Sequence, residues 1–145
     1  MRIRLLGTVL ACALAAVLVT GAAGSSSKRA VVIKFEKDCP EWTCWETPGS
    51  PVRVSAEIFP VEDGFEAPLF HYTSVETLSS SKGSVTISIV GVLDTSSTPQ
   101  ETVLKGYVIR GTWKGKDLAG ADVRVRAHRV FADRSIFAGK VTITP

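Results

Sequence analysis

The feature that most constrains this chain is an alternation of apolar and polar side chains that recurs from Ser84 to Thr144. It is clearest in three stretches, at residues 85–93, 123–128 and 137–143. Successive side chains of a β-strand point to opposite faces of a sheet, so a period of two lines one face with apolar groups. The pattern therefore predicts several amphipathic strands that share one core.

The N-terminal half continues this pattern with less regularity. Residues 30–36 and 52–58 alternate cleanly, 59–68 is expected to be a loop, and 69–78 is a strand whose inward face the sequence leaves open. No segment has a helical period. With about seven or eight strands separated by turn signals, the chain is predicted to be all-β, an antiparallel barrel of about eight strands. An immunoglobulin-like β-sandwich is the alternative.

The N-terminus has the layout of a secretory signal peptide. Arg2 and Arg4 precede an apolar run from Leu5 to Thr20, and small residues follow at 21–24. This predicts a signal peptide over residues 1–24, a single barrel domain over 25–145, and a secreted or extracytoplasmic location without stable membrane insertion after cleavage. An uncleaved membrane anchor is the alternative, because the run approaches the roughly 20 residues that a spanning helix needs.

The cysteines agree with export. Outside the apolar run there are two, Cys39 and Cys44, and an even pair in a short exported chain indicates a disulfide. A metal site would need about two further ligands, and the chain has only two histidines, neither of them near in sequence. The sequence therefore predicts a disulfide here, with no metal and no cofactor.

The charge balance argues against one class of partner. Removing Arg2 and Arg4 from the 17 basic residues leaves 15 against 14 acidic ones, a net charge of +1. A nucleic-acid-binding domain is expected to carry a strong basic excess. We therefore expect no nucleic-acid partner.

Two groups of side chains are candidates for binding. A barrel of about eight strands can hold one small ligand, and the candidate lining residues are Phe70, His71, Tyr72, Tyr107 and Trp113. If the interior is filled, the same residues are core. The second group would bind an anion and consists of Arg124, Arg126 and His128, with Lys114 and Lys116 as helpers. The alternative is that these charges keep an outer sheet face hydrated.

Four short motifs resemble a loose family of small secreted prokaryotic proteins whose fold is similar to the barrels of dirigent proteins and allene oxide cyclases. The motifs are Gly83-Ser84-Val85-Thr86, Gly91 with Asp94, the run from Gly106 to Gly111, and Leu118-Ala119-Gly120. The resemblance covers about the C-terminal half. It implies an antiparallel eight-stranded barrel and no settled activity. Glu57, Glu76 and Asp94 lie on the polar side of the strand patterns or on an ambiguous side, so the buried acid of the cyclases is mapped onto none of them and no catalytic role is carried over.

The sequence contains no catalytic constellation. It has no zinc-protease helix, nucleophile elbow or phosphate loop, and a serine nucleophile would need an oriented base, for which only His71 and His128 are available. We therefore expect a non-enzymatic binding or structural module that holds a small apolar ligand or a partner. The alternative is a lumen enzyme of cyclase or isomerase type acting on a small apolar substrate. The sequence leaves the oligomeric state open.

Overall fold

The computed structural model describes residues 29–145, and for residues 62–66 it describes the backbone alone. This part of the chain is all-β. Its strands are β1 (Val31–Asp38), β2 (Thr43–Glu46), β3 (Arg53–Glu66), β4 (Leu69–Ser80), β5 (Gly83–Asp94), β6 (Glu101–Trp113), β7 (Lys116–Asp117), β8 (Asp122–Arg129) and β9 (Ile136–Thr144). A single 3₁₀ turn, η1 (Pro40–Trp42), joins β1 to β2.

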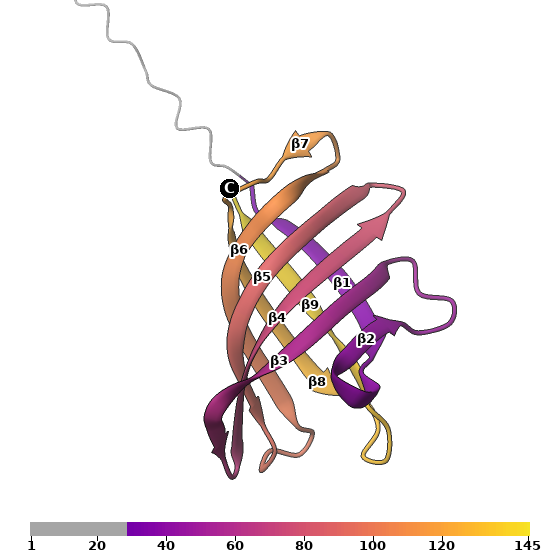
Figure 1. Cartoon of the computed structure of the whole chain (residues 1–145). Coiled ribbons are helices and arrows are strands. Elements are labelled where there is room, and N and C mark those ends of the chain that lie inside the picture. The colour runs from indigo at the N-terminus through magenta and orange to yellow at the C-terminus, as the bar shows by residue number, and fades with distance from the viewer. Residues whose placement is uncertain (1–28) are drawn as a thin grey trace, which may run out of the picture.

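The sheet closes on itself. Its strand order is β5-β4-β3-β2-β1-β9-β8-β6, every pairing is antiparallel, and β5 also pairs with β6. Figure 1 shows the resulting tilted barrel, with β7 as a short extension beside the end of β6. The prediction of a closed eight-stranded antiparallel barrel is confirmed, and the sandwich is excluded because the edges of the sheet are hydrogen-bonded to each other.

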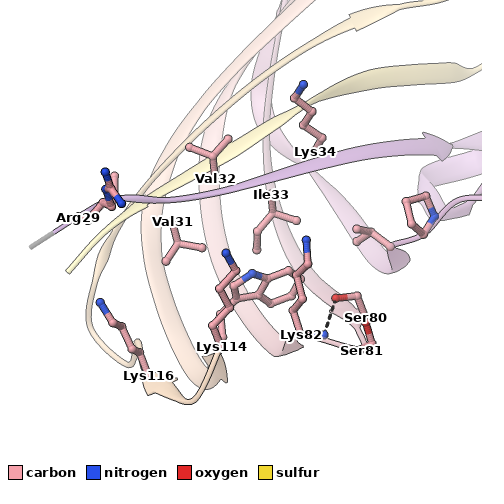
Figure 2. A pocket seen from close by; sticks show the side chains of 14 residues that line it. Arg29, Val31, Val32, Ile33, Lys34, Ser80, Ser81, Lys82, Lys114 and Lys116 are labelled. Atoms are coloured by element: carbon pink, nitrogen blue, oxygen red, sulfur yellow. Dashed lines mark hydrogen bonds between the residues drawn. The ribbon is translucent and has the colours of Figure 1, made fainter.

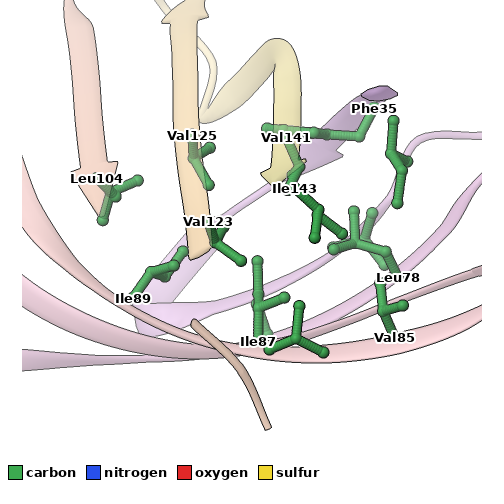
Figure 3. Packing of buried hydrophobic residues seen from close by; sticks show 14 of the residues in the cluster. Phe35, Leu78, Val85, Ile87, Ile89, Leu104, Val123, Val125, Val141 and Ile143 are labelled. Carbon is green, nitrogen blue, oxygen red and sulfur yellow. The ribbon is translucent and has the colours of Figure 1, made fainter. Parts of the chain in front are cut away.

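The alternation seen in the sequence fills the middle of the barrel. Along β8, Val123 and Val125 are almost fully buried, whereas Arg124 and Arg126 are exposed. Side chains from all around the sheet meet in one cluster (Figure 3), among them Leu78, Val85, Ile87, Ile89, Leu104, Val141 and Ile143. Since these medium-sized aliphatics are buried, the central part of the lumen is a packed core, and space for a ligand is left toward its ends.

The backbones of β5 and β6 approach each other closely at several glycines. A Cβ on Gly106 would lie 1.8 Å from the backbone oxygen of Ser88, and Gly91 faces Val103 in the same way. The ladder also skips a residue at Ile109, which has no partner between the pairs formed by Val108 and Arg110. Strand glycines and bulges of this kind allow a sheet to coil tightly enough to close.

The expectation for the segment that precedes β4 is wrong. Residues 59–68 do not form a long loop, because β3 continues to Glu66 and pairs with β4 across an irregular stretch between Pro60 and Phe65. The two prolines and the three acidic residues of this stretch belong to the far end of a long hairpin, where β3 leads into β4. The predicted signal peptide lies outside the described residues. Within residues 29–145, no helix has the length and apolar character needed to cross a bilayer.

Candidate functional site

One end of the lumen opens into a small cavity that we call the aromatic mouth. It has a volume of about 130 Å³ and is lined by Lys37, Cys39, Trp42, Ile58, Phe70, Tyr72, Leu93, Thr102 and Phe137. These residues belong to β1, η1, β3, β4, β5, β6 and β9, except Cys39, which joins β1 to η1. The lining is mostly apolar, and its polar groups come from few side chains, which is the usual composition of a small-molecule site.

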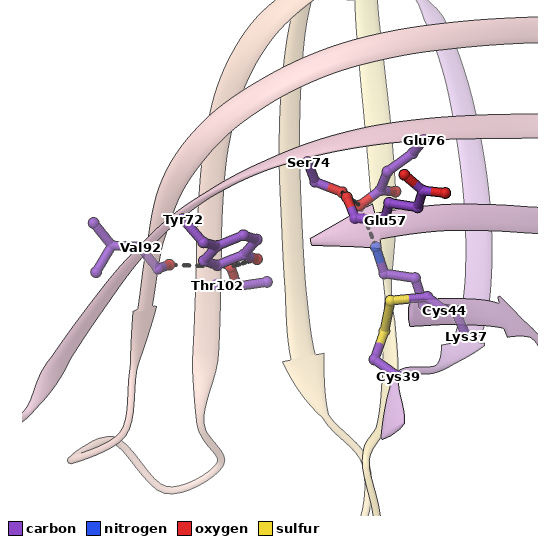
Figure 4. Close-up of polar contacts among 9 residues, drawn as sticks. All are labelled: Lys37, Cys39, Cys44, Glu57, Tyr72, Ser74, Glu76, Val92 and Thr102. Atoms are coloured by element: carbon purple, nitrogen blue, oxygen red, sulfur yellow. Dashed lines mark hydrogen bonds and ion pairs between the residues drawn. A yellow bond between two sulfur atoms is a disulfide. The ribbon is translucent and has the colours of Figure 1, made fainter. Parts of the chain in front are cut away.

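A buried ion pair lies at this end of the barrel. Lys37 Nζ donates to Glu76 Oε1 at 2.5 Å, and the two side chains are 7% and 1% exposed. Lys37 is on β1 and Glu76 is on β4, and both point into the barrel (Figure 4). The ammonium also lies 5.2 Å from the centre of the Phe35 ring, a cation–π distance. Lys37 therefore brings a cation to an apolar cavity.

The carboxylate of Glu76 is not fully hydrogen-bonded. Ser74 Oγ is 2.8 Å from the backbone oxygen of Glu57 and 3.4 Å from Glu76 Oε1, so its single proton goes to the nearer acceptor. Among the described residues, no donor reaches Glu76 Oε2. A buried carboxylate oxygen without a donor is costly, and such groups call for a specific explanation.

A second polar group lines the same mouth. Thr102 Oγ1 donates to the backbone oxygen of Val92 at 3.0 Å, so the 2.6 Å contact between Tyr72 and Thr102 must have the Tyr72 hydroxyl as its donor. Burial raises the pKa of Tyr72 to about 12, and the charge of Glu76 adds to this effect. Tyr72 is therefore neutral, and its oxygen retains lone pairs that can accept a hydrogen bond.

The disulfide shapes the outer wall of the mouth. Cys39 and Cys44 are bonded, as predicted, and close a loop over η1. Within this loop Glu41 and Trp42 have φ angles of 51° and 72°, a conformation that non-glycine residues rarely adopt. The loop sets the half-exposed Trp42 ring 5.3 Å from the ring of Phe70, which stacks on Tyr72 in turn.

The structure brings only some of the predicted lining residues together. Phe70 and Tyr72 line the aromatic mouth, whereas Trp113 lines a hollow bounded by the opposite strand ends. His71 and Tyr107 lie on the outer surface and line neither cavity. The bulge at Ile109 explains why Tyr107 and Trp113, which alternation places on one face, lie on opposite faces.

The predicted anion-binding group is also divided. Arg124, Arg126 and His128 are exposed on the outer face of β8. Lys114 and Lys116 lie at a barrel end, in the hairpin between β6 and β7. Across the sheet Arg126 faces Lys140, and Lys140 faces Lys34, so this outer face is cationic.

Sequence reasoning missed the ion pair although both signals were present. Glu76 is in phase with Tyr72 and Leu78 along β4, and Lys37 is in phase with Ile33 and Phe35 once β1 is extended beyond Glu36. Charged residues are rarely placed inside a sheet unless they are paired, and the partner lies 39 residues away in sequence. Among the described residues no three metal-ligating side chains gather into a site.

Comparison of this chain with known proteins finds no relative. No family of known proteins, no curated protein and no solved structure matches this chain.

Proposed function

We propose that this protein is an exported binding module that holds a small, largely apolar ligand in its aromatic mouth. The observation that carries the proposal is the combination of an apolar cavity, a buried cation and an unsatisfied carboxylate oxygen at one end of a closed barrel. The disulfide agrees with an oxidising compartment. The eight-stranded barrel is compatible with likeness to the dirigent and allene oxide cyclase barrels, and that likeness remains part of the proposal.

The size of the cavity limits the ligand. At about 130 Å³ it is much smaller than the several hundred Å³ of a pocket for a drug-sized molecule. An apolar cavity of about 150 Å³ engineered in another protein binds benzene. The aromatic mouth therefore fits a ligand with one ring or a comparable short chain.

The polar groups define what the ligand carries. The ammonium of Lys37 has three protons, one of which goes to Glu76 Oε1. The hydroxyl oxygen of Tyr72, which lines the mouth, can accept a hydrogen bond, and Glu76 lies directly behind Lys37 without lining the mouth itself. A hydroxyl group both donates and accepts, so a small alcohol with an aromatic body is the ligand class that matches both the wall and the polar groups.

The test compares benzyl alcohol with toluene, which has the same ring without the hydroxyl. We expect saturable binding of benzyl alcohol by calorimetry or amide chemical shifts, weaker binding of toluene, and loss of both after Leu93→Trp fills the cavity. Val90→Trp on the exposed outer face is the matched control and should bind normally. Absence of saturable binding to the wild-type protein, or equal loss in both variants, would refute the proposal.

A second candidate function is a lumen enzyme of cyclase or isomerase type, favoured by the Lys37–Glu76 pair. Lys37 lines the apolar mouth and is paired with Glu76 behind it, so its ammonium can exchange a proton with a small substrate while the carboxylate balances the charge. This candidate predicts turnover that Glu76→Gln abolishes while ligand affinity remains. Binding without turnover of any small cyclisable or isomerisable compound leaves the binding module as the function.

A further inference from the structure

The end of the barrel opposite to the aromatic mouth has a groove of about 540 Å³ that we call the cationic mouth. It is bounded by the start of β1, the turn between β4 and β5, and the hairpin between β6 and β7. Its cationic lining residues are Arg29, Lys34, Lys82, Lys114 and Lys116, and no acidic residue lines it. In the described part of the chain none of these five side chains forms a salt bridge.

The floor of this groove is apolar. Ile33, Val52 and Trp113 are buried core residues whose outer surfaces form its base, and Val31 lies beside them. Figure 2 shows Val31 and Ile33 pointing down from β1 toward the side chains of Lys82 and Lys114. The groove therefore combines an apolar base with a rim of positive charge.

Two of the cations are held next to each other by the backbone. The Lys114 amide donates to the carbonyl oxygen of Lys82 at 2.7 Å, which ties together two turns that follow different strands. Like charges in adjacent positions repel, and among the described residues no carboxylate forms a salt bridge with either lysine. A bound anion would remove it.

Lys114 also has an unfavourable backbone conformation. It and Gly115 form a two-residue hairpin turn with φ angles of 51° and 74°. Asparagine is preferred over lysine at the first position of such a turn, because its side chain tolerates positive φ. Folding alone therefore favours an asparagine in place of Lys114, and the lysine at this position points to a role for its charge.

We propose that the cationic mouth binds a small amphiphilic anion, with its apolar body on the floor formed by Ile33 and Trp113 and its charged head between Lys82 and Lys114. The anionic head can be a sulfate, carboxylate or phosphate, since Lys82 and Lys114 offer flexible ammonium groups rather than a fixed fork. This site is separate from the aromatic mouth, and neither proposal depends on the other.

The experiment uses octyl compounds that share one chain and differ in the head group, each below its micelle concentration. Octyl sulfate should bind with chemical-shift changes at Trp113 and Lys82, more weakly as salt is raised, because salt screens charges. Octyl phosphate and octanoate compare the head groups. Octanol and octyltrimethylammonium should bind about tenfold more weakly or not at all. Equal binding of octyl sulfate and octanol would overturn the proposal.

A variant that folds well keeps the test decisive. Lys114→Asn should raise the midpoint of thermal unfolding and weaken octyl sulfate binding several-fold, a combination that a purely structural lysine would not produce. The double variant Lys82→Gln/Lys114→Asn should abolish binding. Lys105→Gln/Arg124→Gln, which removes two charges from the outer wall, is the matched control and should bind as the wild type does. Equal weakening in the two double variants would refute the site.

Discussion

The ion pair between Lys37 and Glu76 gives the sharpest prediction, because the two partners differ in their access to water. Lys37 lines the aromatic mouth, and the flexible lysine stem can carry its ammonium outward. Glu76 does not line the mouth, is 1% exposed, and has a short side chain. Removal of one partner should therefore cost more when Glu76 is the residue left behind.

The magnitude follows from the behaviour of buried pairs. Breaking such a pair by removing one partner costs about 3–5 kcal/mol, whereas replacing both partners with apolar residues is near neutral or stabilising. We expect Lys37→Met to lower the free energy of unfolding by about 5 kcal/mol and Glu76→Leu by about 3 kcal/mol. The double variant should cost less than either single change, on the order of 1 kcal/mol, which makes the coupling energy large.

The assay is urea unfolding of the wild type and the three variants at neutral pH, followed by circular dichroism, with unchanged denaturant slopes as the check that the folded states are comparable. Additive effects of the two substitutions would refute the pair as the reason that these charges are tolerated inside the barrel. A larger loss for Glu76→Leu than for Lys37→Met would refute the argument from solvent access.

Three further predictions follow from the same structure. Replacing Cys39 and Cys44 by alanine should lower the free energy of unfolding by roughly 2 kcal/mol, as expected for so short a closed loop. It should also weaken the binding of benzyl alcohol. Unchanged affinity in calorimetry would show that the loop does not shape the aromatic mouth. Because the pKa of Tyr72 is raised to about 12, Tyr72 contributes stability that is present below pH 10, the ordinary tyrosine value, and is lost as the pH rises through 12. Tyr72→Phe should abolish this part of the alkaline loss of stability. An identical alkaline profile of the variant and the wild type would contradict the raised pKa of Tyr72. Gly106→Ala should destabilise the barrel by about 1–3 kcal/mol, because the added Cβ meets the backbone of the neighbouring strand. A neutral effect in thermal unfolding would mean that β5 and β6 lie farther apart at this position than in the structure.

The sequence predicts the barrel well because each strand of the C-terminal half carries its own alternation. On β8, Val123 and Val125 fall inside and Arg124 and Arg126 outside without reference to any other strand. The disulfide is predictable for a similar reason, because the number and spacing of the cysteines are local properties. Features that depend on one segment are therefore readable from the chain.

The site is not readable in this way, because it depends on contacts between distant segments. The ambiguous strand at 69–78 is settled by its partner, since Glu76 can lie inside only where Lys37 meets it. Trp113 and Tyr107 lie on opposite faces of β6 because of a bulge that exists only in the pairing of β5 with β6. Alternation alone cannot place such residues.

The most direct test of the central claim, that a buried ion pair equips the aromatic mouth for a ligand, is nuclear magnetic resonance of the lysine side-chain ammonium groups. The account predicts that the Lys37 ammonium is protected from exchange with water, lies near Glu76, and shifts when benzyl alcohol is added. An ammonium that exchanges as rapidly as that of the exposed Lys105, or that is protected but unmoved by saturating benzyl alcohol, would contradict it.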